Sequence, residues 1–504
     1  MNKYTYFKIL SVMLVSLLYV GCSDSFLELD NPNGITDQTF WQTEKDLESG
    51  LATVYKALSE NSDGSYYQRT NPQLVEGRTE NFTVSTDVVG RYNIGTFIST
   101  MSDWQIATLY NWCYRGIFRA NQVIHYSNQI KNIDENKKNQ FVAEAKFLRA
   151  LNYFNLANEW GAVPIVTSLA ESSDDYFKAK SPIEEVWQQV VTDLQEAAPH
   201  LPVSYPADQA GRITNGAAIA FLGKAYLYQE KWDQAVAEFE KLVLDEGKYG
   251  YDLMEDYAHN FDGLHENNKE SIFEIQYSRL RPDVWGGKGA TSTVIAQEVA
   301  GPKIGWQEIR PTKTLLEAFL KEKTAEGDFD PRATTTIVWN YPGAMYYQKP
   351  FLELYADTAV WTKKYQNWWN ENEGDYRSAL NEHVMRYADV LLMLAEAYTM
   401  KGDVAKAAPL VQRIRNRAKL VNKEPEMKQW TKEVMMKEIQ HQRNLEFVRE
   451  MLHWFDLRRW GLLEETLRLS KVEGWQNYSS KFQYYPIPES ELNNNPALTQ
   501  NDPW

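Results

Sequence analysis

The side chains best suited to bind a ligand are aromatic residues in loops rich in glycine and asparagine. The chain has 17 tryptophans and 30 tyrosines among its 504 residues, and aromatic residues make up 13% of it. Aromatic rings are large, rigid and amphipathic, so they fill cores as readily as they form binding surfaces. The candidates for a binding surface are Trp285 in PDVWGGKG, Trp306, Trp339, Tyr341, and Trp368 in YQNWWNENEG. Core packing and contact with a partner protein are the alternatives for each of them.

Motifs for catalysis and metal binding are absent from the sequence. It contains no HExxH, GxSxG, CxxC or P-loop pattern, and Gly286–Gly289 has the wrong spacing for a phosphate-binding loop. The seven histidines show no spacing typical of zinc ligands. We therefore predict no catalytic residue, no metal ligand and no cofactor, although loop carboxylates leave a Ca²⁺ site open. The 68 acidic residues also leave open a pair of carboxylates suited to glycoside hydrolysis.

The charge balance argues against one class of partner. Acidic side chains outnumber basic ones by 68 to 53, and the formal net charge is −15 at pH 7. An acidic chain has no electrostatic attraction to a polyanion, so we expect no nucleic-acid partner. A charged fraction of 24% and a hydrophobic fraction of 43% fit an ordered globular protein.

The N-terminus predicts export and lipidation. Residues 1–21 have a basic start and then an apolar run over residues 9–20, which is too short to span a membrane. A small residue directly before Cys22 resembles the lipobox of bacterial lipoproteins, in which the cysteine is acylated. We predict lipidation of Cys22 and a tether over residues 22–42; an ordinary signal peptide or a buried helix is the alternative. Cys113 then has no disulfide partner and is expected to be buried.

A repeated pair of helices is the clearest internal pattern. Residues 216–244 and 388–416 share one arrangement of small and large residues. In the first copy Gly223 and Ala235 are 12 positions apart. In the second copy Ala395 and Ala407 are also 12 positions apart. Such offsets are typical of tetratricopeptide helix pairs, in which small residues allow close approach. Further helices are predicted near residues 43–58, 104–131, 135–160, 183–201 and 431–460.

The remaining segments lack helical spacing. Residues 61–100 read as a long loop, and residues 245–380 as an irregular insertion that contains a strand at Ile272–Tyr277. The last 34 residues, 471–504, read as an extended wrap over the surface. The predicted fold is mainly α: one domain over residues 43–504, with a helix-pair scaffold at 43–244 and 381–470 that carries a loop-rich ligand-binding insertion. Charged residues within 431–460 are expected to form internal ion pairs that fix helix packing.

Several long stretches of the sequence resemble motifs of one protein family, and they occur in the same order along the chain as in that family. HWFDLRRWG (453–461), YYPIPESEL (484–492) and RYADVLLMLAEAY (386–398) are similar to signatures of the SusD/RagB family. FWQTEKDLESGLATVYKAL (40–58) and AEAKFLRALNYFNLANEWGAVPIV (143–166) are similar to its early helices. The sequence departs from the family pattern at three structural positions, where Arg449, Met451 and His453 replace Phe, Gly and Arg.

This resemblance implies a function. Members are lipoproteins of the outer membrane of Bacteroidota that face the extracellular side. They capture oligosaccharides, or peptides in one branch, and pair with a SusC-like TonB-dependent transporter. The resemblance implies a non-catalytic, glycan-binding protein; a peptide-binding protein is the first alternative and a polysaccharide-degrading enzyme the second. Sugar rings would stack on Trp or Tyr, and their hydroxyls would bond to Asn, Asp, Glu or Arg side chains.

The resemblance also implies site residues in the early loop. Glu76-Gly-Arg78-Thr-Glu80-Asn81 is similar to a family element that lies near the ligand, with Glu80 in place of an Asp. Arg78, Glu80 and Asn81 are therefore candidate ligand-binding residues, and ion pairs that brace the loop are the alternative. Trp104, which precedes a helix that recurs in the family, is expected to be a core residue.

Overall fold

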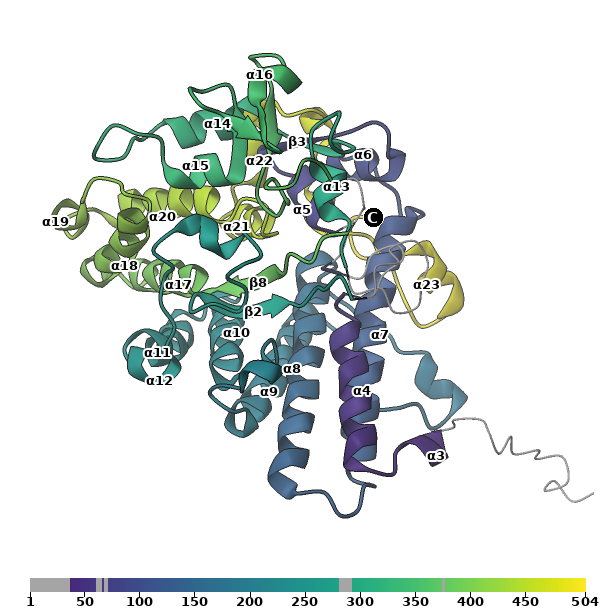
Figure 1. Cartoon of the computed structure of the whole chain (residues 1–504). Coiled ribbons are helices and arrows are strands. Elements are labelled where there is room, and N and C mark those ends of the chain that lie inside the picture. The colour runs from purple at the N-terminus through teal and green to yellow at the C-terminus, as the bar shows by residue number, and fades with distance from the viewer. Residues whose placement is uncertain (1–36, 60–65, 68–70, 281–291, 374–376) are drawn as a thin grey trace, which may run out of the picture.

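The computed structural model describes residues 37–59, 66–67, 71–280, 292–373 and 377–504 (Figure 1). The predicted sites at Cys22 and Trp285 lie outside these residues.

Helices before the insertion are α3 (Asp37–Phe40), α4 (Glu44–Lys56), α5 (Asn71–Gly77), α6 (Val89–Gly95), α7 (Trp104–Ser127), α8 (Glu135–Glu159), α9 (Ile183–Ala197), α10 (Asn215–Tyr228), α11 (Trp232–Val243) and α12 (Glu246–Tyr249). Later helices are α13 (Ile295–Val299), α14 (Lys313–Leu320), α15 (Pro331–Thr336), α16 (Phe351–Leu354), α17 (Tyr387–Met400), α18 (Val404–Arg417), α19 (Glu424–Met427), α20 (Lys432–Glu446), α21 (His453–Arg459), α22 (Leu463–Ser470) and α23 (Glu489–Asn494).

The predicted repeat forms two helix pairs, α10–α11 and α17–α18, and this prediction is confirmed. The first pair depends on the small residue at its crossing. A Cβ atom added to Gly223 would lie 2.5 Å from the ring of Phe239 on α11. The two pairs then pack together through α11 and α17, so the copies form one continuous helical body although they are far apart in the sequence.

Adding a methyl group at this crossing is expected to destabilise the protein. We expect Gly223→Ala to lower the free energy of unfolding by about 1–3 kcal/mol, because overpacking outweighs the better helix propensity of alanine. The control is Gly247→Ala in α12, where an added Cβ would meet nothing within 4 Å. Denaturant unfolding of both variants tests this. Equal stability of the two would show that α10 and α11 move apart at little cost.

The N-terminal helices pack around α8. Thr43 begins α4 with a capping box, in which its side chain accepts a hydrogen bond from the Asp46 amide and the Asp46 carboxylate bonds back to the Thr43 amide. Helices α7 and α9 flank α8 (Figure 1). A buried bidentate ion pair joins α8 to α9, since Arg149 Nε and Nη2 lie 2.9 and 2.6 Å from the Asp193 carboxylate. This ion pair fixes α9 against α8.

Short strands connect the scaffold to the insertion. The strands are β1 (Phe82–Val84), β2 (Ser271–Ile275), β3 (Ile309–Pro311), β4 (Ile337–Trp339), β5 (Met345–Tyr346), β6 (Lys349–Pro350), β7 (Val360–Thr362) and β8 (Glu382–Arg386). They form antiparallel pairs β1–β3, β2–β8, β4–β7 and β5–β6. The strand predicted at Ile272–Tyr277 is confirmed as β2. The pairing of β1 with β3 attaches the early segment to the insertion, so α5 and α6 lie beside α13 and β3 (Figure 1).

Two predictions from local spacing are wrong. Residues 61–100 are not a continuous loop, because they contain α5, β1 and α6. These elements are short and are stabilised by distant partners such as β3, so helical or alternating spacing is too brief to reveal them. Residues 431–460 are not one helix either. Helix α20 ends at Glu446, and the chain adopts positive φ at Arg449 (69°) and Met451 (57°) before α21 begins.

The expected internal ion pairs are confirmed. Arg443 on α20 pairs with Asp389 on α17 at 2.7 Å and with Asp456 on α21 at 2.8 Å, and its side chain is fully buried. Arg459 on α21 pairs with Glu396 on α17. These contacts hold α21 against the second helix pair despite the break after α20.

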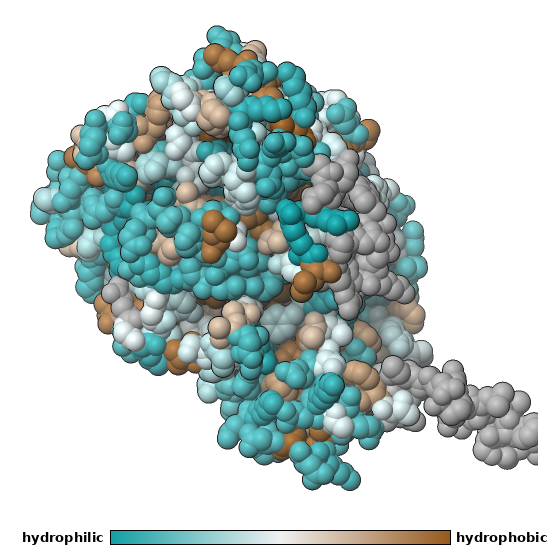
Figure 2. Space-filling view, in the orientation of Figure 1, coloured by the Kyte–Doolittle hydropathy of each residue, from teal (hydrophilic) through white to brown (hydrophobic). Residues whose placement is uncertain are grey.

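Among the described residues, no helix has the length and apolar character needed to cross a membrane. One face of the molecule is mostly hydrophilic, and its apolar residues form small separate patches (Figure 2). Single apolar residues are normal on such a surface, so ligand binding has to be sought at particular aromatic side chains.

Candidate functional site

The early-loop candidates Arg78, Glu80 and Asn81 lie inside the protein, where 2%, 7% and 1% of their surfaces are exposed. Arg78 Nη2 lies 2.9 Å from Glu159 Oε2 on α8. Its guanidinium group stacks between two rings, those of Trp454 (4.5 Å) and Tyr485 (4.4 Å). Each face of Arg78 is thus occupied by the protein itself.

Glu80 and Asn81 are engaged in the same way. Glu80 Oε1 lies 2.8 Å from His453 Nε2, and Asn81 Nδ2 donates to Asn444 Oδ1 at 2.8 Å. Burial lowers the pKa of His453, but the Glu80 carboxylate outweighs this and raises the pKa above its ordinary value. The alternative of loop bracing therefore describes all three early-loop residues, and their expected contact with a ligand is not supported by this placement.

The insertion candidates divide between core and surface. Trp339 on β4 is buried and packs against Tyr341 at 4.6 Å and Phe329 at 5.2 Å, so it is a core residue. Tyr341 at the edge of this cluster is half-buried. Trp306, in the turn between α13 and β3, is also half-buried, and its amide donates to the carbonyl of Gln297 at 2.9 Å. Trp306 and Tyr341 are therefore each partly accessible to solvent.

Trp368 is the most exposed of the predicted ligand-binding residues that the structure describes, with 37% of its surface accessible. Its ring meets that of Trp369 edge-on, with centroids 5.8 Å apart and an angle of 74°. The ammonium group of Lys363 lies 4.5 Å from the Trp368 ring centroid and donates to the carbonyl of Thr334 at 3.1 Å. The cation–π contact restrains the ring, although more than a third of the residue's surface stays accessible to solvent.

Buried hydrogen bonds hold the loop that carries Trp368. The Glu373 carboxylate accepts hydrogen bonds from the amide of Asn367 at 2.9 Å, from its side chain at 2.8 Å and from Tyr347 Oη at 2.5 Å. All three residues are buried. A ligand that stacks on Trp368 therefore meets a platform that is already ordered, which reduces the entropy lost on binding.

Trp104 was expected in the core, and the structure contradicts this. It is the first residue of α7, and 53% of its surface is exposed. Its position directly after the N-cap residue Asp103 is the signal that could have shown this, because the first turn of a helix has no preceding turn to pack against. Trp104 is a second exposed ring, on the scaffold and outside the insertion.

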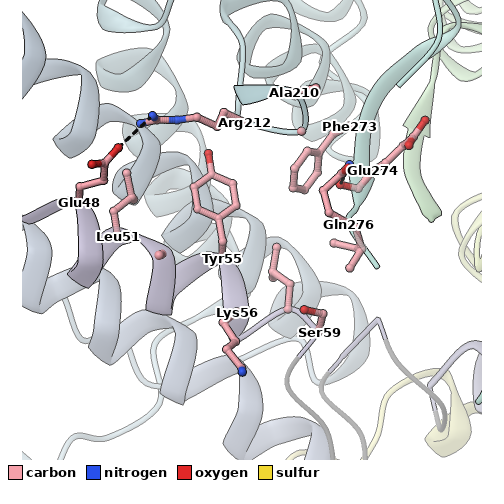
Figure 3. A pocket seen from close by; sticks show the side chains of 14 residues that line it. Glu48, Leu51, Tyr55, Lys56, Ser59, Ala210, Arg212, Phe273, Glu274 and Gln276 are labelled. Atoms are coloured by element: carbon pink, nitrogen blue, oxygen red, sulfur yellow. Dashed lines mark hydrogen bonds and ion pairs between the residues drawn. The ribbon is translucent and has the colours of Figure 1, made fainter. Parts of the chain in front are cut away.

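A hollow of about 420 Å³ opens between α4, the segment 210–212 and β2 (Figure 3). The Tyr55 ring lies between Leu51 and Phe273, and Arg212 reaches toward Glu48 at 3.7 Å (Figure 3). Tyr55 Oη donates to Glu144 at 2.6 Å. The sequence could not reveal this hollow because its walls come from three distant segments. Its inner surface is mainly apolar, so it suits a hydroxyl-rich ligand less well than the Trp368 loop.

Comparison with known proteins gives matches over both ends of the chain. Residues 269–504 match a model described as the SusD family, and residues 25–227 match one described as starch-binding and associating with the outer membrane. SusD-like protein P25 of Formosa agariphila is 25% identical over 98% of both chains.

Solved structures agree. A SusD superfamily protein from Bacteroides vulgatus ATCC 8482 is 35% identical, with a TM-score of 0.85 over 92% of this chain and 100% of that one. A structure named as a laminarin-binding SusD-like protein is 26% identical, with a TM-score of 0.77 over 92% of this chain and 100% of that one. From its sequence and its fold, this chain belongs to the SusD family.

Proposed function

We propose that this protein is a non-catalytic glycan-binding lipoprotein of the outer membrane. In this proposal Cys22 carries the lipid, the folded domain faces the extracellular side, and captured oligosaccharides pass to a SusC-like TonB-dependent transporter. Family membership and the outer-membrane description of the matched model support the location. The relative named for laminarin binding supports a carbohydrate ligand.

The observation that carries the proposal is the open, braced ring of Trp368. A sugar presents C–H groups on one face, and these pack against an aromatic ring. Lys363 lies against the ring, and Asn370 and Glu371 follow shortly after it in the chain; all three are at least partly open to solvent and suit the hydroxyl edge of the same sugar. The half-buried rings of Trp306 and Tyr341 are further candidates in the insertion. The proposed surface excludes the buried residues Arg78, Glu80, Asn81 and Trp339.

Removing the Trp368 ring is expected to weaken glycan binding. For Trp368→Ala we expect at least a tenfold higher Kd, about 1.4 kcal/mol, because the sugar loses its stacking surface. Calorimetry with the best-binding oligosaccharide tests this. The matched control is Tyr176→Ala, which removes another exposed ring (72%) from a short helix of the scaffold. Unchanged affinity for Trp368→Ala would remove Trp368 from the site.

A further inference from the structure

Folding brings together two histidines and an aspartate that the sequence spacing did not single out. His259 lies in the short 3₁₀ helix η4 (Tyr257–Asn260), and Asp262 and His265 follow in the next loop. One ligand atom from each of these three side chains lies within 4.8 Å of the other two. His265 Nδ1 is 2.8 Å from Asp262 Oδ2, and the two imidazole rings stack with centroids 4.1 Å apart.

We propose that His259, Asp262 and His265 bind one divalent transition-metal ion of the Zn²⁺ class. Two imidazole nitrogens and one carboxylate oxygen are a donor set that Zn²⁺ and its neighbours in the first transition series prefer, whereas Ca²⁺ and Mg²⁺ prefer oxygen donors alone.

The two carboxylate oxygens of Asp262 have different partners. Asp262 Oδ1 accepts hydrogen bonds from the amides of Leu264 at 2.8 Å and His265 at 3.2 Å, and this fixes the loop. Oδ2 faces the His265 ring and is the oxygen available to a metal ion. A metal ion would therefore take its carboxylate ligand without displacing the bonds that shape the loop.

The loop is also attached to the interior. Asn268 Nδ2 donates to the carbonyl of His265 at 2.8 Å and to Asn260 Oδ1 at 3.2 Å. Asn260 Nδ2 in turn donates to the buried Glu270 carboxylate at 3.0 Å. These hydrogen bonds hold the loop around His265 against Asn260 and Glu270, and a bound Zn²⁺ ion would draw the three side chains to metal–ligand distances of about 2.0–2.2 Å.

Solvent exposure permits an ion to enter. The side chain of His265 is 41% exposed and that of Asp262 is 16% exposed. Three protein ligands leave at least one position of a tetrahedral ion to water. The loop also lies beside the aromatic platform, because a Cβ on Gly263 would be 3.9 Å from the ring of Trp369. This site goes beyond the proposed function and does not depend on it.

The test is calorimetric titration of the untagged mature protein with Zn²⁺, together with the visible absorption of Co²⁺. We expect one equivalent of metal to bind. His259→Ala and His265→Ala should each weaken binding at least tenfold. Asp262→Asn, which keeps an oxygen for the two amide bonds, should weaken binding without changing the fold seen by circular dichroism.

His200→Ala is the matched control, because it removes an exposed histidine from another short 3₁₀ helix, Ala198–His200. We expect it to bind metal like the wild type. Lack of saturable binding of Zn²⁺ and Co²⁺ would overturn the proposal, and so would equal affinity of the wild type, His259→Ala and His265→Ala. Loss of binding in the histidine variants with an unchanged circular dichroism spectrum would support it.

Discussion

Replacing Glu446 by glutamine is expected to lower the free energy of unfolding by about 3–5 kcal/mol. Glu446 ends α20 and is fully buried. Its carboxylate accepts from Arg386 Nη1 at 2.9 Å and from Arg417, and it lies 3.5 Å from Arg332 Nη1. Burial alone would raise the pKa of Glu446, but the three guanidinium groups hold it far below its ordinary range. Arg386 and Arg417 also contact Glu270, and Arg332 also contacts Asp330, but glutamine would still remove the one carboxylate that all three buried cations share.

The loss of stability would affect several parts of the molecule, because the three arginines lie in different elements. Arg386 ends β8, Arg417 ends α18 and Arg332 lies in α15 of the insertion. Chemical denaturation measures the effect. The control is Glu433→Gln on the exposed first turn of the same helix, for which we expect less than about 1 kcal/mol. A similar small loss for Glu446→Gln would contradict a structural role for the cluster.

The second large effect is pH-dependent and concerns Glu382 on β8. Burial raises the pKa of Glu382 to about 8, although the positive charge of Arg449 acts in the opposite direction. The ordinary value is 4.5. Between about pH 5 and 8 the folded protein keeps a proton that the unfolded chain has lost. Stability from this group therefore falls as the pH rises, by up to about 1.4 kcal/mol per pH unit.

Glu382→Gln cannot ionise and should lack this loss. We expect the stability of the variant, measured relative to the wild type, to rise between about pH 5 and 8 and then to level off. Denaturation curves at several pH values measure the difference, in which the contributions of all other groups cancel. Glu326→Gln, at an exposed loop position, is the control. A difference that stays constant over this range would mean that Glu382 ionises normally in the folded state.

The sequence predicted the scaffold better than the insertion, and the reason is physical. Gly223 and Ala395 sit in helices whose packing repeats along the chain, so their local spacing carries the information. Strand β1 forms because it pairs with a strand more than 200 residues away. The spacing of hydrophobic residues within β1 carries no information about that distant partner.

The candidate site shows the same limit. Trp368 stands in a polar segment, and its exposure follows from that composition. Arg78 also stands in a polar segment, yet Glu159, Trp454 and Tyr485 enclose it from distant parts of the chain. Whether a polar or aromatic side chain binds a ligand or braces a loop depends on such long-range contacts, and the structure was needed to separate the two.

Glycan binding is tested most directly by calorimetric titration of the purified mature protein with a panel of oligosaccharides. We expect saturable binding of at least one glycan, with no new reducing ends after prolonged incubation. Lack of binding to every glycan, both for the protein alone and together with a SusC-like transporter, would contradict the proposed function.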